Sequence, residues 1–283
     1  MANIGPFELD TIVAGDAYKL IKEIPDKSID LIYTDIPYLY NQGGSGSSEL
    51  GERTAKKRLE LMGCSDVYLE NKDTTRGEAL RIAKNKKKQN LDIISIEDGI
   101  NYDILNDFVR VMKRVNCFIW CSKLQLFDIM KFFLDGTLKQ KIGKEIYFEM
   151  LCWCKTNPTP TTNNSWLPDI EYCLYFREQG VPYNNGYDLK HKYYVSPANV
   201  ADKERFYHPT CKPVDFVKKH IQHTSQEGDT VLDCFCGSGT TCVAAKDTNR
   251  HYLGIELENK WVEISRDRLN NTDARGQYSM FTF

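Results

Sequence analysis

The chain has 283 residues, of which 41% are hydrophobic and 27% charged, with a net charge of −2. This composition is typical of a globular enzyme with a large core and excludes a disordered chain. No apolar run approaches the roughly 20 residues of a membrane span, and the amino terminus lacks the pattern of a secretory signal. We therefore expect a cytoplasmic protein with no membrane partner.

The first third of the chain predicts two strands and a helix, followed by a segment without a regular pattern. Residues 9–14 predict a strand, an amphipathic helix then ends at Pro25, and residues 29–34 predict a buried strand. Residues 39–90 begin rich in glycine and serine, become highly charged, and concentrate lysine and arginine. On charge alone, a mobile insertion that contacts nucleic acid and a solvated surface loop stay equally open.

The remainder of the chain alternates helices with strands. The predicted elements, in chain order, are a helix at 104–112, a strand at 115–121, a helix at 124–134, strands at 146–154 and 170–176, a polar, tyrosine-rich stretch at 177–207, a helix at 213–223, a strand at 230–233, a helix at 240–247, a strand at 252–256 and a last helix around 261–269. Such alternation predicts one α/β domain over residues 1–283, a doubly wound, mostly parallel Rossmann-like sheet with helices on both faces. Ligands of such sheets bind at the carboxyl ends of the strands.

The ten cysteines include no pair at the two-residue spacing that is typical of zinc sites. Many lie in strand-like apolar runs, such as residues 115–121 and 149–154, where a free cysteine packs as a small apolar side chain. We therefore expect core cysteines in a reducing compartment and no metal site.

Asp35-Ile36-Pro37-Tyr38 closes the strand at residues 29–34. The Asp35 carboxylate and the Ile36 carbonyl are two acceptors suited to a single NH₂ group. Pro37 restricts the backbone, and the ring of Tyr38 is suited to stacking on a planar substrate. An ordinary strand-to-loop turn contains such residues too, but the long segment that follows favours a functional site.

A glycine-rich loop follows the strand at residues 230–233, and its residues are Asp233, Phe235, Gly237, Ser238, Gly239, Thr240 and Thr241. Glycines without a Cβ let a ligand approach the backbone, and the helix that starts at Thr240 presents free N–H groups to a carboxylate. Glu256, at the end of the next strand, suits the two ribose hydroxyls of an adenosine ligand. A bare turn is the alternative, but a strand-end acid about twenty residues after the glycines favours a ligand.

A nicotinamide dinucleotide is the first competing ligand for this loop. Its binding motif requires a third glycine three residues after Gly239, where this chain has Cys242. No pyrophosphate-type loop is evident either, so an NAD-dependent oxidoreductase is a distant alternative.

Together these motifs resemble the β-class amino-methyltransferases of bacterial and phage restriction–modification systems, which methylate adenine N6 or cytosine N4 in DNA. The tetrapeptide at residues 35–38 is similar to their catalytic Asp-Pro-Pro-Tyr, residues 233–241 to their cofactor loop, and residues 254–256 to their ribose-binding strand. Residues 153–160 resemble their tryptophan–lysine–asparagine–proline stretch, and residues 208–213 their His-Pro-Thr-x-Lys-Pro segment. The catalytic motif precedes the cofactor loop, which is the permuted order of this class.

The resemblance implies S-adenosylmethionine as the cofactor, with S-adenosylhomocysteine as product, and direct in-line transfer to a flipped-out base. It assigns catalysis to Asp35, Ile36, Pro37 and Tyr38. The strand at residues 9–14 is expected to continue the cofactor half of the sheet, with Asp16 as the contact to the cofactor's adenine. The implied cofactor residues are Asp16, Ala17, His208, Thr210, Lys212, Asp233, Phe235, Gly237, Ser238, Gly239, Thr240, Thr241 and Glu256.

Within this family Asp35 favours adenine as the target, because the cytosine-N4 members more often carry serine at that position. Ile36 replaces a proline of the family motif, which keeps the carbonyl but predicts a less rigid loop. Cytosine-N4 methylation, RNA adenine methylation and an inactive DNA-binding subunit stay open as alternatives.

The resemblance also implies DNA as the partner, double-stranded rather than single-stranded. Residues 39–90 are expected to contact its phosphates, and residues 177–207 are a candidate for target recognition, although either segment is compatible with a plain surface loop. A cognate restriction endonuclease and a homodimer stay open.

Overall fold

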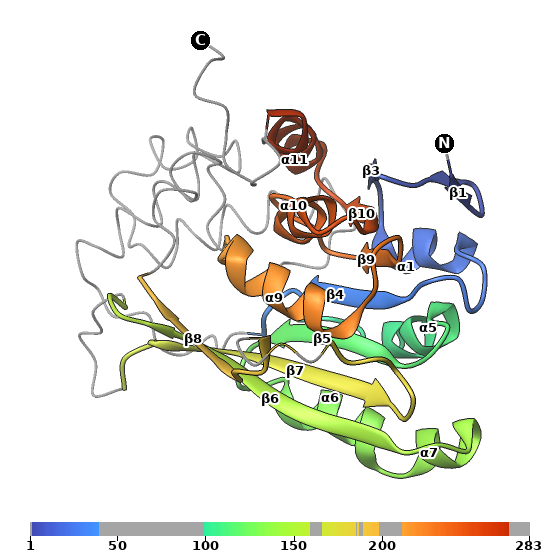
Figure 1. Ribbon diagram of the computed structural model, residues 1–283, viewed down its shortest axis with the longest axis vertical. Coiled ribbons are helices and arrows are strands. Elements are labelled where there is room, and N and C mark those ends of the chain that lie inside the picture. Colours follow the sequence, from blue (N-terminus) through green and yellow to red (C-terminus); the bar gives the residue numbers. More distant parts are fainter. Residues whose placement is uncertain are drawn as a thin grey trace, which may run out of the picture.

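A computed structural model describes residues 2–39, 99–158, 166–184, 186, 189–197 and 211–271. In this part of the chain, one sheet of eight strands has the order β3-β10-β9-β4-β5-β7-β6-β8 (Figure 1). Its strands are β3 Thr11–Ala14, β4 Leu31–Asp35, β5 Asn116–Cys121, β6 Ile146–Lys155, β7 Ile170–Glu178, β8 Tyr193–Ser196, β9 Thr230–Asp233 and β10 His251–Glu256. Of the predicted insertion at residues 39–90, all but Leu39 lies outside the described residues, and the segment 177–207 is described in part.

The sheet is mostly parallel, which confirms the predicted fold class. Strands β3, β10, β9, β4 and β5 run parallel to one another, and β8 runs parallel to β6. Strand β7 is antiparallel to both of its neighbours, β5 and β6. A parallel pairing of β6 and β7 would need a crossover, usually a helix, and the segment between them lacks a helical pattern, so these two strands pair antiparallel.

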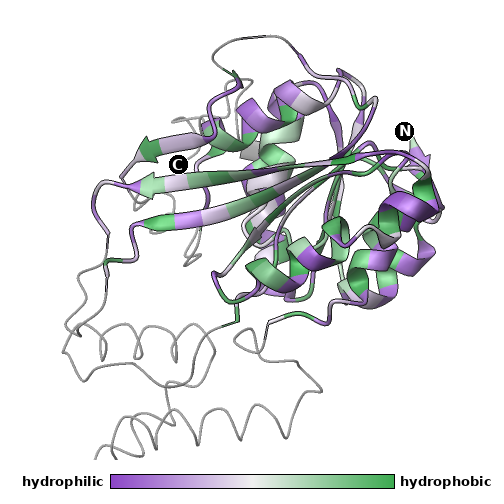
Figure 2. Cartoon of the chain, turned by 90° about the horizontal axis from the view of Figure 1, so that it is seen from below, coloured by the Kyte–Doolittle hydropathy of each residue, from purple (hydrophilic) through white to green (hydrophobic). Residues whose placement is uncertain are grey.

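Helices cover both faces of the sheet (Figures 1 and 2). One face carries α1 Ala17–Leu20, the 3-10 helix η1 Ile21–Glu23, α5 Ile104–Val111, α6 Leu126–Leu134 and α7 Thr137–Ile142; the other carries α9 Val214–Thr224, α10 Thr240–Asp247 and α11 Asn259–Asn271. Strand side chains alternate between two cores, so Ile32 packs toward α5 while Leu31 and Tyr33 pack toward α9. Among the described helices, none has the length and apolarity to cross a membrane.

Strands from the two ends of the chain are neighbours in the sheet, as the sequence predicts. Strand β3, from the amino-terminal end, pairs in parallel with β10, from the carboxyl-terminal end. Strand β9 lies between β10 and β4, so the strand before the glycine loop is next to the strand before the Asp-Ile-Pro-Tyr tetrapeptide. Because these strands are parallel, their carboxyl ends share one edge of the sheet.

Three elements lie outside the predicted set: a small hairpin of β1 Asn3–Ile4 and β2 Phe7–Glu8, helix α7, and strand β8. Strand β8 lies in the polar, tyrosine-rich stretch at residues 177–207, for which the sequence predicted no strand. Tyr193 and Val195 are exposed while Tyr194 is partly buried, the alternation of a strand at a sheet edge. A strand of four residues with one solvated face carries too few apolar side chains to be distinguished from a loop.

Candidate active site

The Asp-Ile-Pro-Tyr tetrapeptide leaves the carboxyl end of β4 and is anchored by hydrogen bonds on two sides. The Ile36 N–H donates to the Trp120 carbonyl at 3.2 Å, and Gln125 Nε2 donates to the Pro37 carbonyl at 2.9 Å. Gln125 is fully buried, so the second bond is shielded from water. A proline in place of Ile36 has no N–H to make the first bond. The substitution that predicted a looser loop therefore supplies an extra restraint.

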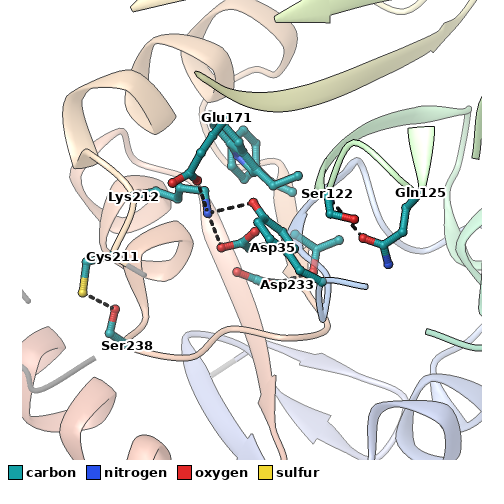
Figure 3. A network of polar contacts seen from close by, with 12 residues as sticks. Asp35, Ser122, Gln125, Glu171, Cys211, Lys212, Asp233 and Ser238 are labelled. Atoms are coloured by element: carbon teal, nitrogen blue, oxygen red, sulfur yellow. Dashed lines mark hydrogen bonds and ion pairs between the residues drawn. The ribbon is translucent and has the colours of Figure 1, made fainter. Parts of the chain in front are cut away.

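A buried lysine joins the tetrapeptide to strand β7. Lys212 is 4% exposed, and its Nζ lies 2.5 Å from Asp35 Oδ2 and 3.2 Å from the Tyr38 hydroxyl (Figure 3). Glu171 Oε2 lies 3.0 Å from the same nitrogen, in an ion pair that lacks the direction of a hydrogen bond. The ammonium thus lies between two carboxylates from different strands.

The second oxygen of Asp35 is open. Asp35 Oδ1 is buried, and no group in the described part of the chain donates a hydrogen bond to it. Buried acceptors are nearly always satisfied in folded proteins, so an unsatisfied carboxylate oxygen at the carboxyl edge of a sheet indicates a place for a donor from a ligand. An amine hydrogen has the required chemistry.

The pKa values follow from this arrangement. Burial raises the pKa of Asp35, and Lys212 opposes that shift. Burial alone would lower the pKa of Lys212, but Asp35 and Glu171 together raise it. Burial also disfavours the charged form of Glu171, yet Lys212 and Lys155 lower its pKa to about 2. Lys155 Nζ lies 2.5 Å from Glu171 Oε1, so charges of alternating sign lead from Lys155 to Asp35.

The glycine loop is shaped to exclude side chains. Gly237 and Gly239 have φ angles of +51° and +77°, and a Cβ on Gly239 would lie 2.9 Å from Ser265 Cβ. Glu256, at the end of β10, contacts the loop with one carboxylate oxygen and the backbone after β10 with the other. Its Oε2 accepts the Gly237 N–H at 2.9 Å, and its Oε1 accepts the Glu258 N–H at 3.0 Å.

Asp233 connects this loop to the strand of the tetrapeptide. Its Oδ1 accepts hydrogen bonds from Thr34 Oγ1 at 2.8 Å and from the Phe235 N–H at 3.1 Å. Burial raises the pKa of Asp233 to about 7, although hydrogen bonds from Thr241, Thr34 and the Phe235 N–H act in the opposite direction. Near neutral pH this carboxyl is therefore close to its titration midpoint.

Asp16 and Ala17 lie beside the end of β10, where the Gly15 N–H donates to the Glu256 carbonyl at 2.8 Å. Asp16 caps helix α1 through a 2.9 Å hydrogen bond from the Tyr18 N–H, and Ala17 is buried. The ring of Tyr18 stands edge-on to that of Phe235, with their centroids 6.3 Å apart. The strand-end acids and the aromatic residue predicted near the cofactor are thus brought together.

The remaining predicted residues support the loop or lie outside the described chain. Ser238, Thr240 and Thr241 are buried, and Arg268 donates to the Ser238 carbonyl at 3.1 Å and to Thr240 Oγ1 at 3.0 Å. Cys211 Sγ lies 3.3 Å from Ser238 Oγ, so the segment before α9 touches the glycine loop as well as, through Lys212, the tetrapeptide. His208 and Thr210 are outside the described residues.

The sequence analysis did not identify Gln125 and Glu171. The signal for Glu171 was available: a single acid in the otherwise apolar and aromatic run at residues 170–176. Gln125 gave no comparable signal, because its contact with Pro37 depends on the pairing of β4 with β5. Across the described residues, no group of three or more His, Cys, Asp or Glu side chains is placed to hold a metal ion.

The loop with Gly237 and Gly239 lies beside Glu256 and Asp233, and one oxygen of Asp35 is open, so fold and site have the layout expected of an amino-methyltransferase. The sequence model of the family described as DNA methylase matches residues 29–267, and the chain belongs to this family. It is 25% identical over 281 residues to the type II methyltransferase M2.LlaDCHI of Lactococcus lactis subsp. cremoris, across 94% of this chain and 91% of that protein. It is likewise 25% identical over 274 residues to the type II methyltransferase M2.DpnII of Streptococcus pneumoniae, across 91% and 88%.

Solved structures share the fold. The M1.HpyAVI–SAM complex matches with a TM-score of 0.57 and 21% identity, over 92% of this chain and 99% of that one. The PvuII DNA methyltransferase, which is cytosine-N4-specific, matches with a TM-score of 0.54 and 14% identity, over 96% and 87%. The predicted resemblance to restriction–modification amino-methyltransferases is confirmed, as is S-adenosylmethionine as the cofactor of the family.

Replacing Asp233 by asparagine should remove a pH dependence of folding stability. With a pKa of about 7 in the folded chain and about 3.9 in the unfolded chain, the folded state binds more protons between these values. The free energy of unfolding therefore falls as pH rises from about 4 to about 7, and it is then constant. Urea unfolding at pH 5 and pH 8 should show a smaller fall for Asp233→Asn than for the wild type. Equal falls would show that Asp233 does not carry this titration.

Proposed function

We propose that this chain is a site-specific DNA adenine-N6 methyltransferase. The observation that carries the proposal is the buried, unpartnered Oδ1 of Asp35 in a tetrapeptide that also holds Tyr38. Family membership supports transfer to an exocyclic amine of DNA. The aspartate at the first position of the tetrapeptide supports adenine, because serine is more common there in the cytosine-N4 enzymes that the chain resembles.

The cofactor residues are proposed from the same edge of the sheet. When bound, S-adenosylmethionine supplies an electrophilic methyl group. Glu256 would accept the ribose hydroxyls, and Asp16 would contact the adenine ring. Asp233 and the N-terminus of α10 at Gly239 would bind the charged amino-acid end, with the helix favouring its carboxylate. His208, Thr210 and Lys212 remain predicted members of this site, although the Lys212 ammonium contacts Asp35 and Glu171 on the side of the tetrapeptide.

The target base would be held by the tetrapeptide. An adenine inside a duplex is out of reach, so the base must be flipped out at a cost of a few kcal/mol, and stacking on Tyr38 would return ~1–3 kcal/mol. Asp35 Oδ1 and the Ile36 carbonyl would accept the two amine hydrogens and so direct the nitrogen lone pair toward the methyl group. Catalysis would come from orientation and from preorganised electrostatics, without a covalent enzyme intermediate.

DNA binding is proposed to use the two segments identified in the sequence. Lysine and arginine side chains of residues 39–90 would contact phosphates, which makes binding salt-dependent, and residues 177–207 would contribute to target recognition. Double-stranded DNA is the proposed substrate, and a cognate restriction endonuclease and a homodimer are proposed partners.

The function is tested by incubating the protein with isotopically labelled S-adenosylmethionine and unmethylated genomic DNA. The DNA is digested, and the labelled nucleoside is identified by mass spectrometry. Labelled N6-methyladenine supports the proposal. Labelled N4-methylcytosine would keep the family chemistry but contradict the adenine assignment, and label in RNA alone would contradict DNA as the substrate.

Asp35→Ala should lower the methyl-transfer rate at least a hundredfold, because the acceptor that orients the amine is lost. S-adenosylmethionine affinity, measured by calorimetry, should change by less than about threefold, a difference below 1 kcal/mol. A loss of cofactor affinity with an unchanged transfer rate in bound protein would assign Asp35 to the cofactor site instead.

Glu256→Ala should have the reverse effect and weaken S-adenosylmethionine binding about tenfold or more, since hydrogen bonds to a charged group contribute roughly 1.5–3 kcal/mol. Glu263→Ala is the matched control, an exposed acid on the neighbouring helix α11, and should bind the cofactor as the wild type does. Equal affinities of both variants and the wild type would contradict the ribose assignment.

A further inference from the structure

Lys212 contacts only one of the two carboxylate oxygens of Asp35. Its ammonium lies 2.5 Å from Asp35 Oδ2, while Oδ1 of the same carboxylate has no hydrogen-bond partner in the described chain. A free ammonium has three donors and readily approaches both oxygens of a carboxylate. Here Glu171 Oε2 is a second anionic partner, 3.0 Å from the same nitrogen, while Asp35 contributes only Oδ2 (Figure 3).

Glu171 is itself held in place from strand β6. Lys155 Nζ lies 2.5 Å from Glu171 Oε1, and the two side chains are only 15% and 16% exposed. Lys155 also lies over the ring of Trp153, 5.3 Å from its centroid, and Trp153 Nε1 donates to Ser196 Oγ of β8 at 2.9 Å. Glu171 of β7 is thus linked directly to β6 through Lys155, and Trp153 links that part of β6 to β8.

We propose that Glu171 is a positioning residue for methyl transfer: it restrains the Lys212 ammonium to Asp35 Oδ2 and so keeps Oδ1 open for the target amine. The inference rests on the proposed function, in which Asp35 binds that amine. Without the negative charge of Glu171, the ammonium would turn to Asp35 alone and compete with the substrate for Oδ1. The residue acts through Lys212 and does not touch the base.

The titratable groups around Asp35 determine how its pKa would change when Glu171 or Lys212 is replaced. The groups that face it are Lys212 before α9, Glu171 and Cys173 of β7, Cys121 of β5, Tyr33 and Tyr38 on or after β4, and Asp233 of β9. Burial raises the pKa of both thiols and both phenols, so these groups are neutral near pH 7. The positive charge of Lys212 lowers the pKa of Asp35, and the negative charge of Glu171 raises it.

The test compares Glu171→Gln with Lys212→Met in single-turnover methylation of DNA, with saturating cofactor, from pH 5.5 to pH 9. Glu171→Gln should lower the plateau rate about tenfold or more, as expected for a misplaced reacting group. Its acid limb should move to lower pH, because Asp35 keeps Lys212 and loses Glu171. Lys212→Met should move the acid limb to higher pH. The two limb shifts report the charges that Asp35 senses. The loss of plateau rate at unchanged cofactor affinity separates a positioning role of Glu171 from a purely electrostatic effect on Asp35.

Glu149→Gln is the matched control. Glu149 pairs with Lys192 in an exposed ion pair that involves strand β6, away from Asp35, and its loss should leave the rate and the pH profile unchanged. Cofactor affinity should be the same within about twofold for Glu171→Gln and the wild type. Should Glu171→Gln fail to fold because Lys155 is left unpaired, the double variant Glu171→Gln/Lys155→Met removes both charges and should show the same rate loss and acid-limb shift.

Three results would overturn the inference: a plateau rate for Glu171→Gln within about twofold of the wild type, an acid limb that moves to higher pH, or a parallel loss of cofactor affinity. The last would indicate general damage to the site. A wild-type protein that methylates no DNA would overturn the proposed function and this inference together, whereas an active wild type with an unaffected Glu171→Gln variant would overturn the inference alone.

Discussion

The buried ammonium of Lys212 is the interaction on which the architecture of the site depends. Taking a charge out of water costs several kcal/mol, and only close counter-charges offset that cost. Asp35 from β4 and Glu171 from β7 are those counter-charges, and β5 lies between their strands. Lys212 therefore stabilises the folded chain only where the carboxyl end of β4 and the amino end of β7 are held at the spacing of the sheet. Removal of either carboxylate would leave charge buried without its full compensation.

The same ammonium gives the site its asymmetry. In the proposed function, Asp35 is the stronger acceptor for an amine hydrogen when it is ionised, but burial favours its protonated form. The neighbouring Lys212 ammonium lowers the pKa of Asp35. The same ammonium also occupies a carboxylate oxygen that the proposed substrate amine would otherwise contact. The structure reconciles the two demands by dividing Lys212 between Asp35 and Glu171, and the anchors from Trp120 and Gln125 fix the backbone of the tetrapeptide. In the proposed function, the target amine would therefore meet a carboxylate with one oxygen available.

The sequence identified those parts of the site whose position follows from strand order. Parallel strands end at one edge of a sheet, so Asp35, Asp233 and Glu256 were expected to lie together before any pairing was known. Glu171 was missed because its role depends on an antiparallel insertion of β7 beside β5, which alternation of strands and helices does not predict. The hydrogen bond of Ile36 was unforeseen for a related reason: its N–H needs the Trp120 carbonyl, which only strand pairing brings near. The local sequence pattern thus predicts which residues lie at strand ends, but it does not predict which side chains meet across neighbouring strands.

If the proposed site residues are right, the boundary between β9 and β4 is where the cofactor and substrate sites would be coupled. On one side, β9, β10 and β3 end in the acids that border the glycine loop; on the other, β4 and β5 carry the tetrapeptide and its anchors. The Thr34–Asp233 hydrogen bond crosses this boundary, and the charge of Asp35 contributes to the raised pKa of Asp233. Two buried carboxyls on adjacent strands disfavour each other's ionisation, so a cation bound near both would relieve the conflict. S-adenosylmethionine carries a positive sulfonium that is lost on methyl transfer, so the acidic edge would favour the methyl donor over its neutral sulfur product. The arrangement of acids that selects the cofactor would therefore also promote release of S-adenosylhomocysteine.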